Sequence, residues 1–322
     1  MKGREHMCTA ITFLTEDNLH FSARTMDFSF ELDARPIYVP RNHKFESLIP
    51  GTEFTNKYGF IGAGKDINGF IFADGFNERG FSISSLYFEK NAKYSSEAKK
   101  DALNISSTDM VSWALGNISS VAEFEQRCQK INVVDVINPL LQVNVPLHWI
   151  VADKTGNTGV LEITKTGSNF YHNQVGVMTN SPEFSWHLDN LNHYTNLQPT
   201  EFAAKQYGDY TTVPDGPGSG ALGLPGDYTS ASRFVRAAFL RQYSAATKGV
   251  KNGVNAVLHI LNAVDIPKGV KITAKNVSDY TQYKAVMDLD SLSYYFMAYD
   301  DTMLTRADIT EELLQSSDVK IF

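Results

Sequence analysis

The chain opens and closes with paired strand patterns, and these limit its possible folds more than any other feature. Residues 8–14 and 20–26 are short apolar and β-branched runs separated by a polar turn at 15–18. Residues 280–287 and 293–299 form a second such pair. Runs of this kind joined by a short turn predict β-hairpins. Both ends of the chain are therefore expected to lie in β-sheet.

Helices and further strands are predicted in between. Ser120 and Glu123 make a capping box at the start of one helix, which places Cys128 on its buried stripe as a structural residue. Apolar spacing predicts other helices around residues 110–115, 234–239 and 254–261. Strands are predicted at 36–39, 69–73 and 81–87, with 74–80 as a connection, and in a hairpin around 154–157. With no repeat and no long linker, this order indicates one layered α+β domain rather than alternating βαβ units.

Composition narrows the class of protein. The 322 residues carry a net charge of -7 and include 20% charged residues, as in ordinary soluble globular proteins. The absence of a basic cluster argues against nucleic acid or an anionic membrane as a partner. No apolar run approaches the ~20 residues that a membrane-spanning helix needs. Cys8 and Cys128 lie too far apart for a disulfide framework or a metal-ligand spacing, so a reducing, cytoplasmic setting without metal or cofactor is expected.

The first seven residues, MKGREHM, contain charge but no hydrophobic stretch, so they are not a secretory signal. We interpret residues 1–6 as an added or upstream leader and Met7 as the natural initiator. The predicted organisation is a leader at 1–7 and a single domain at 8–322.

Cys8 directly follows Met7, and this order has a chemical meaning. If Met7 is removed, Cys8 carries both a thiol and a free α-amine. The amine has an ordinary pKa of about 7.7–8.0 and the thiol one of about 8.5, so the amine can accept the thiol proton without help from a histidine. One residue would then supply nucleophile and base. The alternative is that Cys8 is a small hydrophobic residue in a buried strand.

Arg24 and Asp27 lie in the next predicted strand and bear on that choice. An arginine near Cys8 would stabilise a thiolate, and an aspartate could orient the amine. A separation of three residues places the two side chains on opposite faces of a regular strand, unless a bulge intervenes at residues 25–26. Taken alone, the two residues also fit a solvated surface pair.

Five motifs in register resemble one known family. "MCTAITF", "ARTMDF", "GFNERG", "GVMTNSP" and "GLPGDYTSASRF" are similar to the signatures of the choloylglycine hydrolases, the N-terminal-nucleophile amidases that include conjugated bile acid hydrolases and penicillin V acylases. The resemblance implies an αββα sandwich of two antiparallel sheets, a homotetramer, and hydrolysis of a non-peptide C–N amide bond. It also implies roles for Cys8 as nucleophile, Arg24 and Asp27 beside it, Asn180 in the oxyanion hole, and Arg233 as a distal arginine.

The resemblance also bears on the substrate. The position of Tyr87 is typically asparagine in bile acid hydrolases and tyrosine in penicillin V acylases. A small-molecule amide with a hydrophobic acyl group is expected, with Phe28 and Phe30 lining an acyl pocket and the Tyr87 ring and backbone N–H available for packing and oxyanion binding. Penicillin V acylase is therefore the main prediction, and conjugated bile salt hydrolase is the alternative.

The sequence alone also allows other interpretations of these residues. Asn180 also fits a turn asparagine before Ser181-Pro182, and Tyr87 fits an ordinary strand aromatic. A papain-like Cys–His enzyme would use His148 or His187. A non-catalytic protein that binds hydrophobic acids would need the leader to stay attached.

Overall fold

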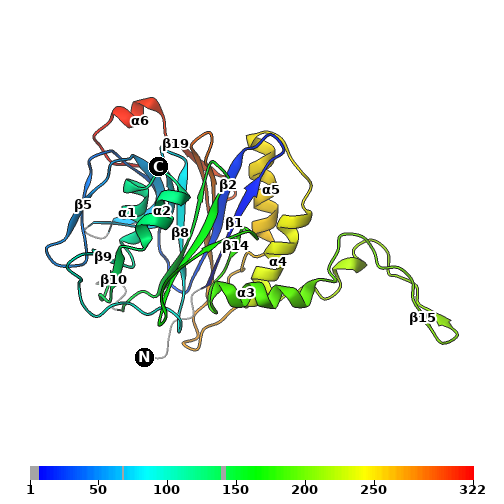
Figure 1. The fold of residues 1–322 in the computed structure, drawn as a ribbon. Helices are drawn as coiled ribbons and strands as arrows, with labels where there is room; N and C mark the ends of the chain where they lie inside the picture. Colours follow the sequence, from blue (N-terminus) through cyan, green and yellow to red (C-terminus); the bar gives the residue numbers. More distant parts are fainter. Residues whose placement is uncertain (1–6, 67–68, 139–142) are drawn as a thin grey trace.

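The computed structural model describes residues 7–66, 69–138 and 143–322. Within these residues, two large antiparallel sheets lie face to face with helices outside them, which confirms the expected αββα layering (Figure 1). The six-stranded sheet has the order β14 (Val177–Met178), β1 (Met7–Leu14), β2 (His20–Phe28), β17 (Tyr280–Asp288), β18 (Ser293–Ala298), β19 (Thr305–Asp308). It joins strands from both ends of the chain.

The eight-stranded sheet comes mostly from the first half of the chain. Its order is β13 (Gly167–His172), β12 (Thr158–Thr164), β11 (Leu147–Asp153), β8 (Phe81–Tyr87), β7 (Phe70–Asn77), β6 (Phe60–Asp66), β3 (Arg35–Val39), β20 (Lys320–Ile321). Three small strand pairs lie outside both sheets: β4 (Lys44–Glu46) with β5 (Glu53–Thr55), β9 (Leu103–Ser106) with β10 (Ile131–Val134), and β15 (Gln206–Tyr207) with β16 (Tyr210–Thr211).

The helices form the two outer layers (Figure 1). One group, α1 (Met110–Asn117) and α2 (Val121–Cys128), covers the eight-stranded sheet. On the other side, α4 (Ser230–Tyr243) and α5 (Val250–Asn262) pack on β1, β2 and β17, while α3 (Phe184–Leu191) packs on α4. A short helix, α6 (Glu311–Gln315), lies near the C-terminus. No helix in the described ranges is both long and apolar enough to cross a bilayer.

The N-terminal hairpin is confirmed, and it is longer than predicted. Strand β1 begins at Met7, which pairs with Asp27, so the last residue assigned to the leader is part of the sheet. The other leader residues, 1–6, lie outside the described residues. The predicted helix that starts after Ser120 is confirmed as α2: the Ser120 hydroxyl accepts a hydrogen bond from the Glu123 N–H, and Cys128 is buried.

The connection predicted at residues 74–80 is wrong in its first half, because β7 continues to Asn77. Asp74 and Asn77 are fully buried, and each has partners in distant elements. The Asn77 amide, for example, donates to the carbonyl oxygens of Leu115 and Ile118, each at 2.7 Å. Gly75 looks like a turn residue but packs against another strand, since a Cβ there would lie 2.5 Å from the Ile61 carbonyl oxygen.

Two apolar clusters hold the layers together. The larger fills the space between the sheets and under α4 and α5, with Ile11, Leu86 and Phe234 among its members. The smaller lies between the eight-stranded sheet and α1 and α2, and it includes Trp149 and Tyr87. Burial on both faces explains why the central strands read as almost continuous apolar runs.

An arm extends from the α3 side of the molecule and ends in the β15–β16 hairpin (Figure 1). Tyr207 and Tyr210 on this hairpin are 66% and 67% exposed.

Candidate active site

Cys8 lies on β1 with its side chain directed into the space between the sheets. Its Sγ is 2.9 Å from Nη2 of Arg24 and 3.7 Å from Sδ of Met26. The residue is only 3% exposed. Because Cys8 pairs with Met26 across the β1–β2 hairpin, the register of that hairpin alone delivers Arg24 and Met26 to the sulfur.

Arg24 is fully buried and is held from the opposite sheet. Its Nη1 donates to the carbonyl oxygens of Ala73 at 3.1 Å and Ser85 at 2.9 Å, and lies 3.5 Å from a carboxylate oxygen of Asp74. Arg24 therefore bridges the two sheets, with one end of its guanidinium on Cys8 and the other on β7 and β8.

The thiol of Cys8 responds to two opposing influences. Burial raises its pKa, and the positive charge of Arg24 lowers it, with a net rise above the ordinary value. The expected stabilisation by the arginine is present, but burial outweighs it. Cys8 is thus held as a thiol that needs a nearby proton acceptor.

Asp27 faces the helical layer, on the opposite side of β2 from Arg24. The β1–β2 pairing is regular through this region, and the only register shift described there lies in β17, between Thr281 and Tyr283. Opposite faces are therefore correct for Arg24 and Asp27. Burial raises the pKa of Asp27 to about 6, an effect reduced by the nearby charge of Arg233 and a hydrogen bond from Thr281.

Asp27 is not the partner of the Cys8 nitrogen in this structure. Its oxygens accept hydrogen bonds from the hydroxyls of Thr281 at 2.6 Å and Thr25 at 3.3 Å. The Cys8 N–H instead donates to Oδ1 of Asn180 at 2.6 Å.

Arg233 connects the remaining groups from the first turns of α4, where it is fully buried. Its Nη1 donates to the Cys8 carbonyl oxygen and to the Thr9 hydroxyl, each at 2.6 Å, and lies 3.9 Å from Asp27. Its Nη2 donates to Oδ1 of Asn180 at 2.8 Å. These contacts explain a cation placed near a helix N-terminus, where the helix dipole disfavours it.

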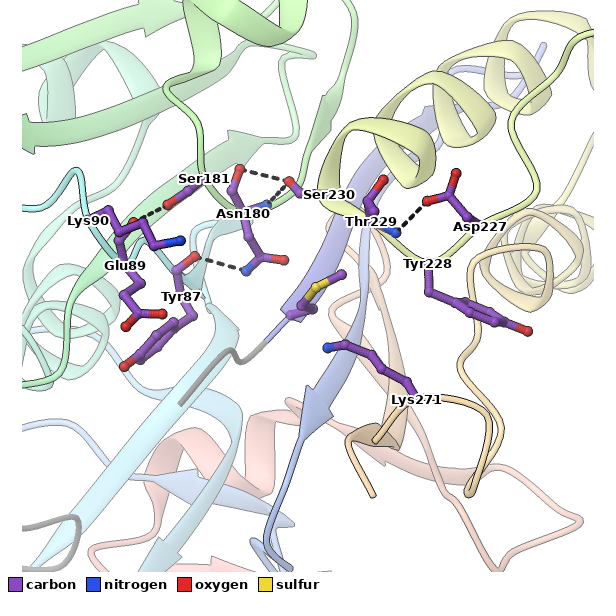
Figure 2. Close-up of a pocket in the computed structure, with 11 residues that line it drawn as sticks. Tyr87, Glu89, Lys90, Asn180, Ser181, Asp227, Tyr228, Thr229, Ser230 and Lys271 are labelled. Atoms are coloured by element: carbon purple, nitrogen blue, oxygen red, sulfur yellow. Dashed lines mark hydrogen bonds between the residues drawn. The ribbon is translucent and has the colours of Figure 1, made fainter. Parts of the chain in front are cut away.

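Asn180 follows β14 and is fixed by contacts on both ends of its amide. Oδ1 accepts from Cys8 and Arg233, while Nδ2 donates to the Tyr87 carbonyl oxygen at 2.9 Å (Figure 2). This pattern fixes which end is oxygen. Since an amide nitrogen carries two hydrogens, one remains for another acceptor.

His148 and His187 lie behind Asn180 rather than beside the sulfur. His148 bonds the Thr179 carbonyl oxygen at 2.8 Å and Glu162 at 3.0 Å, and His187 bonds the Asn180 carbonyl oxygen at 2.8 Å. Burial lowers the pKa of His187 to about 4, so it stays neutral near pH 7. The hydrogen bonds described for these two rings do not involve Cys8, which argues against a papain-like pair.

Two cavities lie near Cys8, and each is lined by a residue that contacts Cys8, although Cys8 itself lines neither. An apolar one of about 240 Å³ is lined by Met26, Phe28 and Phe30, whose last two rings meet edge to face at 4.5 Å. The other, of about 440 Å³, is lined by Asn180 and Tyr87 (Figure 2). The three aromatic residues expected at one acyl pocket are therefore divided between two cavities.

Several residues at this site were not identified from the sequence. Thr9, Met26, Asp74, Thr281 and Ser230 all contact a predicted site residue or its partners. Asp74 falls in the connection predicted at 74–80, because an aspartate followed by a glycine is typical of a turn. The others are ordinary strand or helix-start residues that only the tertiary fold brings close.

Comparison with known proteins gives a consistent family. A family model described as linear amide C–N hydrolases, choloylglycine hydrolase family, matches residues 8–322. The chain is 36% identical over 319 residues to a bile salt hydrolase/transferase of Clostridium perfringens, covering 98% of this chain and 96% of that protein. It is 32% identical over 315 residues to a conjugated bile acid hydrolase of Lactobacillus acidophilus, with 97% and 98% covered.

Comparison with solved structures indicates the same family. A variant of conjugated bile acid hydrolase from Clostridium perfringens matches with a TM-score of 0.91 at 35% identity, covering 98% of this chain and 96% of that one. Penicillin V acylase from Agrobacterium tumefaciens matches with a TM-score of 0.77 at 23% identity, covering 98% and 90%, which indicates a shared fold. The chain therefore belongs to the choloylglycine hydrolase family and is an amidohydrolase acting on linear C–N amide bonds.

Proposed function

We propose that this protein hydrolyses the amide bond of conjugated bile acids, with Cys8 as an N-terminal nucleophile. The observation that carries the proposal is the placement of Cys8: its sulfur lies 2.9 Å from Arg24, its nitrogen lies 2.6 Å from Asn180, and a residue that contacts it lines each of two cavities. The proposal takes residues 1–7 as a leader that is removed and residues 8–322 as the catalytic domain.

The reaction begins with proton transfer within Cys8. Once the α-amine is free, its lone pair accepts the thiol proton as the sulfur attacks the substrate carbonyl carbon. Asn180 orients the amine through Oδ1, and Arg24 stabilises the negative sulfur. Arg233 holds the Cys8 carbonyl oxygen and Asn180 together, so the nucleophile and the amide move as one unit.

Attack places negative charge on the carbonyl oxygen of the substrate. The second Nδ2 hydrogen of Asn180 is the donor for this oxyanion, and losing such a donor costs ~2.7–4 kcal/mol of barrier stabilisation. The protonated α-amine then gives its proton to the leaving nitrogen, the C–N bond breaks, and a thioester remains on Cys8. Water, deprotonated by the same amine, hydrolyses the thioester and releases the acid.

The acyl group occupies the apolar cavity beside Met26, Phe28 and Phe30, where burial of its apolar surface supplies binding energy. The tyrosine at position 87 was the reason for predicting penicillin V as the substrate. In the structure, however, Tyr87 belongs to the buried cluster under α1 and α2 and lines the cavity beside Asn180, not the apolar cavity. The named relatives at 32–36% identity are bile acid hydrolases. We therefore take the bile acid substrate first and penicillin V second.

Side-by-side kinetics test the choice. Protein that begins at Cys8 is assayed with taurocholate, glycocholate and penicillin V. We expect kcat/KM to be at least about tenfold higher for a bile acid conjugate, which corresponds to ~1.4 kcal/mol of transition-state preference. A preference for penicillin V that is lost in Tyr87→Asn would establish the second candidate instead.

The homotetramer implied by the family resemblance stays a prediction, as does the cytoplasmic location. The arm that ends at β15–β16 exposes Tyr207 and Tyr210, which pair across its two strands, and we take these two side chains as candidate contacts between protomers. Sedimentation velocity of the whole chain and of a Tyr207→Ser, Tyr210→Ser variant tests the prediction: the variant should form smaller species if the arm holds protomers together.

A further inference from the structure

The cavity beside Asn180 lies on the amine side of the nucleophile. Met26 touches the Cys8 sulfur and lines the apolar cavity, whereas Asn180 touches the Cys8 nitrogen and lines the second one. Cys8 lines neither cavity itself, but its sulfur contacts a residue of one lining and its nitrogen contacts a residue of the other. A substrate whose carbonyl carbon is at the sulfur extends its acyl part into one cavity and its amine part into the other.

Two ammonium groups point into this second cavity. Figure 2 shows Lys90 and Lys271 on facing walls, each with its nitrogen directed inward toward the space near Tyr87 and Asn180. Two acidic residues, Glu89 and Asp227, belong to the same lining. Asp227 is turned toward the start of α4, where it accepts hydrogen bonds from the Thr229 N–H and the Ser232 hydroxyl, and Glu89 lies on the Tyr87 side of the cavity (Figure 2).

Lys271 is the better placed of the two lysines because it is held in position. Its Nζ donates to a carboxylate oxygen of Asp279 at 2.7 Å, and its side chain is only 18% exposed. Asp279 itself is buried. An ammonium carries three hydrogens, so two stay available after this contact. Fixing the side chain in advance also lowers the entropy that a ligand must overcome on binding.

We propose that Lys271, assisted by Lys90, binds the acid group on the amine part of the substrate. The ligand class is an amide whose nitrogen carries a short chain ending in a carboxylate or sulfonate. Lys271 is then a specificity-determining residue that selects acid-bearing amides over neutral ones. This inference rests on the proposed amide hydrolysis at Cys8, but not on which acyl group is present.

Conjugated bile acids and penicillin V both carry an acid group on the amine part of the amide. Glycine and taurine conjugates end in a carboxylate and a sulfonate close to the amide nitrogen, and the amine part of penicillin V also carries a carboxylate. Lys271 therefore accounts for what these amides share, while the apolar cavity responds to how they differ. A charge-assisted contact of this kind is stronger than a neutral hydrogen bond.

The test compares acid-bearing and neutral amides of the same acid in Lys271→Met protein that begins at Cys8. Taurocholate and glycocholate are measured against the cholic acid amide of 7-amino-4-methylcoumarin. We expect the ratio of kcat/KM for the acid-bearing amide to that for the neutral amide to fall about tenfold, mainly through KM. Lys271→Arg, which keeps the cation, should restore most of the ratio.

Lys275→Met is the matched control, because it removes the same charge from an exposed position in the same loop. Its ratio should equal that of the unaltered protein. Since Lys271→Met leaves Asp279 with one cation fewer, the double variant K271M/D279N is measured as well, and it should show the same selective loss. The proposal is overturned if K271M and the double variant both show the same ratio of kcat/KM, acid-bearing amide to neutral amide, as K275M.

The same design separates this inference from the proposed function. If bile acid amides are not cleaved but penicillin V is, the bile acid proposal fails. Lys271 is then tested with penicillin V against the neutral phenoxyacetyl amide of the coumarin. A tenfold fall in that ratio supports the role of Lys271, and an unchanged ratio overturns it.

Discussion

Replacing Asp74 by asparagine removes one negative charge from between the two sheets and changes little else. The Asp74 carboxylate lies 3.5 Å from Arg24 and accepts hydrogen bonds from the hydroxyls of Tyr283 and Tyr294. All four side chains are buried. An asparagine can still bond both hydroxyls, so the variant isolates the loss of the counter-charge of Arg24.

The cost follows from leaving a buried guanidinium without its carboxylate. Breaking one side of a buried ion pair typically destabilises a protein by ~3–5 kcal/mol. At about 2.1 cal/mol/K of unfolding entropy per residue, the 322 residues give ~0.7 kcal/mol/K. The melting temperature of Asp74→Asn should therefore fall by about 4–7 °C. With Asp74 neutral, Arg24 interacts more strongly with Cys8, so the pKa of the thiol should also fall.

Two measurements check this reasoning. Thermal melts of Asp74→Asn are compared with those of Asp101→Asn, an exposed position that should melt like the unaltered protein. Alkylation of Cys8 as a function of pH then reports the thiol. An unchanged melting temperature would refute the argument: it would mean that burial, which raises the pKa of Asp74, keeps Asp74 protonated and Arg24 already uncompensated.

Three further predictions concern Cys8, the proposed nucleophile, and other residues of the chain. Protein that keeps Met7 should be inactive, because an amide nitrogen is not a base; equal turnover by leader-bearing and processed samples, verified by intact mass, rules out the amino-terminal mechanism. Cys8→Ala should lose about 10⁶-fold in kcat, whereas Cys128→Ala should keep its kcat and lose ~1–2 kcal/mol of stability; inactivation by alkylation of Cys128 would reverse this assignment. Activity should decline below about pH 6, because a protonated Asp27 no longer balances the charge of Arg233, which holds Cys8 and Asn180. Asp27→Asn is neutral at every pH, so this limb of the pH profile should be absent in that variant. Because folding raises the pKa of Asp27 from 3.8, the contribution of Asp27 to stability is full below pH 3.8 and is lost as the pH rises through about 6, which melts at several pH values can measure.

The sequence predicted those parts of the fold that depend on local pattern. Residues 8–14 and 20–26 are apolar and β-branched runs separated by a polar turn, and this pattern correctly predicted the N-terminal hairpin; Ser120 likewise marks the start of α2 correctly. The motifs around Cys8 and Arg233 predicted that distant residues would meet, and the structure brings them together through the Cys8 carbonyl oxygen.

Contacts between the layers could not be predicted from the sequence. Asp74 and Gly75 have the chemistry of a turn, yet both lie in a strand, because Asp74 finds its partners on β2, β17 and β18 and Gly75 lets two strands approach closely. The assignment of the Tyr87 ring to one face of β8 depends on strand register, which a single aromatic residue does not reveal. Local propensity carries no information about such partners.

The position of β1 between β14 and β2 has a consequence for how the protein matures. Cys8 is made among the first residues, but its partner Asn180 lies 172 positions later in the chain. Contacts between residues so far apart in the sequence form slowly, because the entropy cost of closing a long loop comes before the contact contributes any stabilising free energy. On the proposed mechanism, the emerging chain therefore carries an ordinary cysteine, which becomes a nucleophile only after β14 and the Asn180 that follows it have docked beside β1. In refolding experiments, recovery of amidase activity should lag behind recovery of helical circular dichroism.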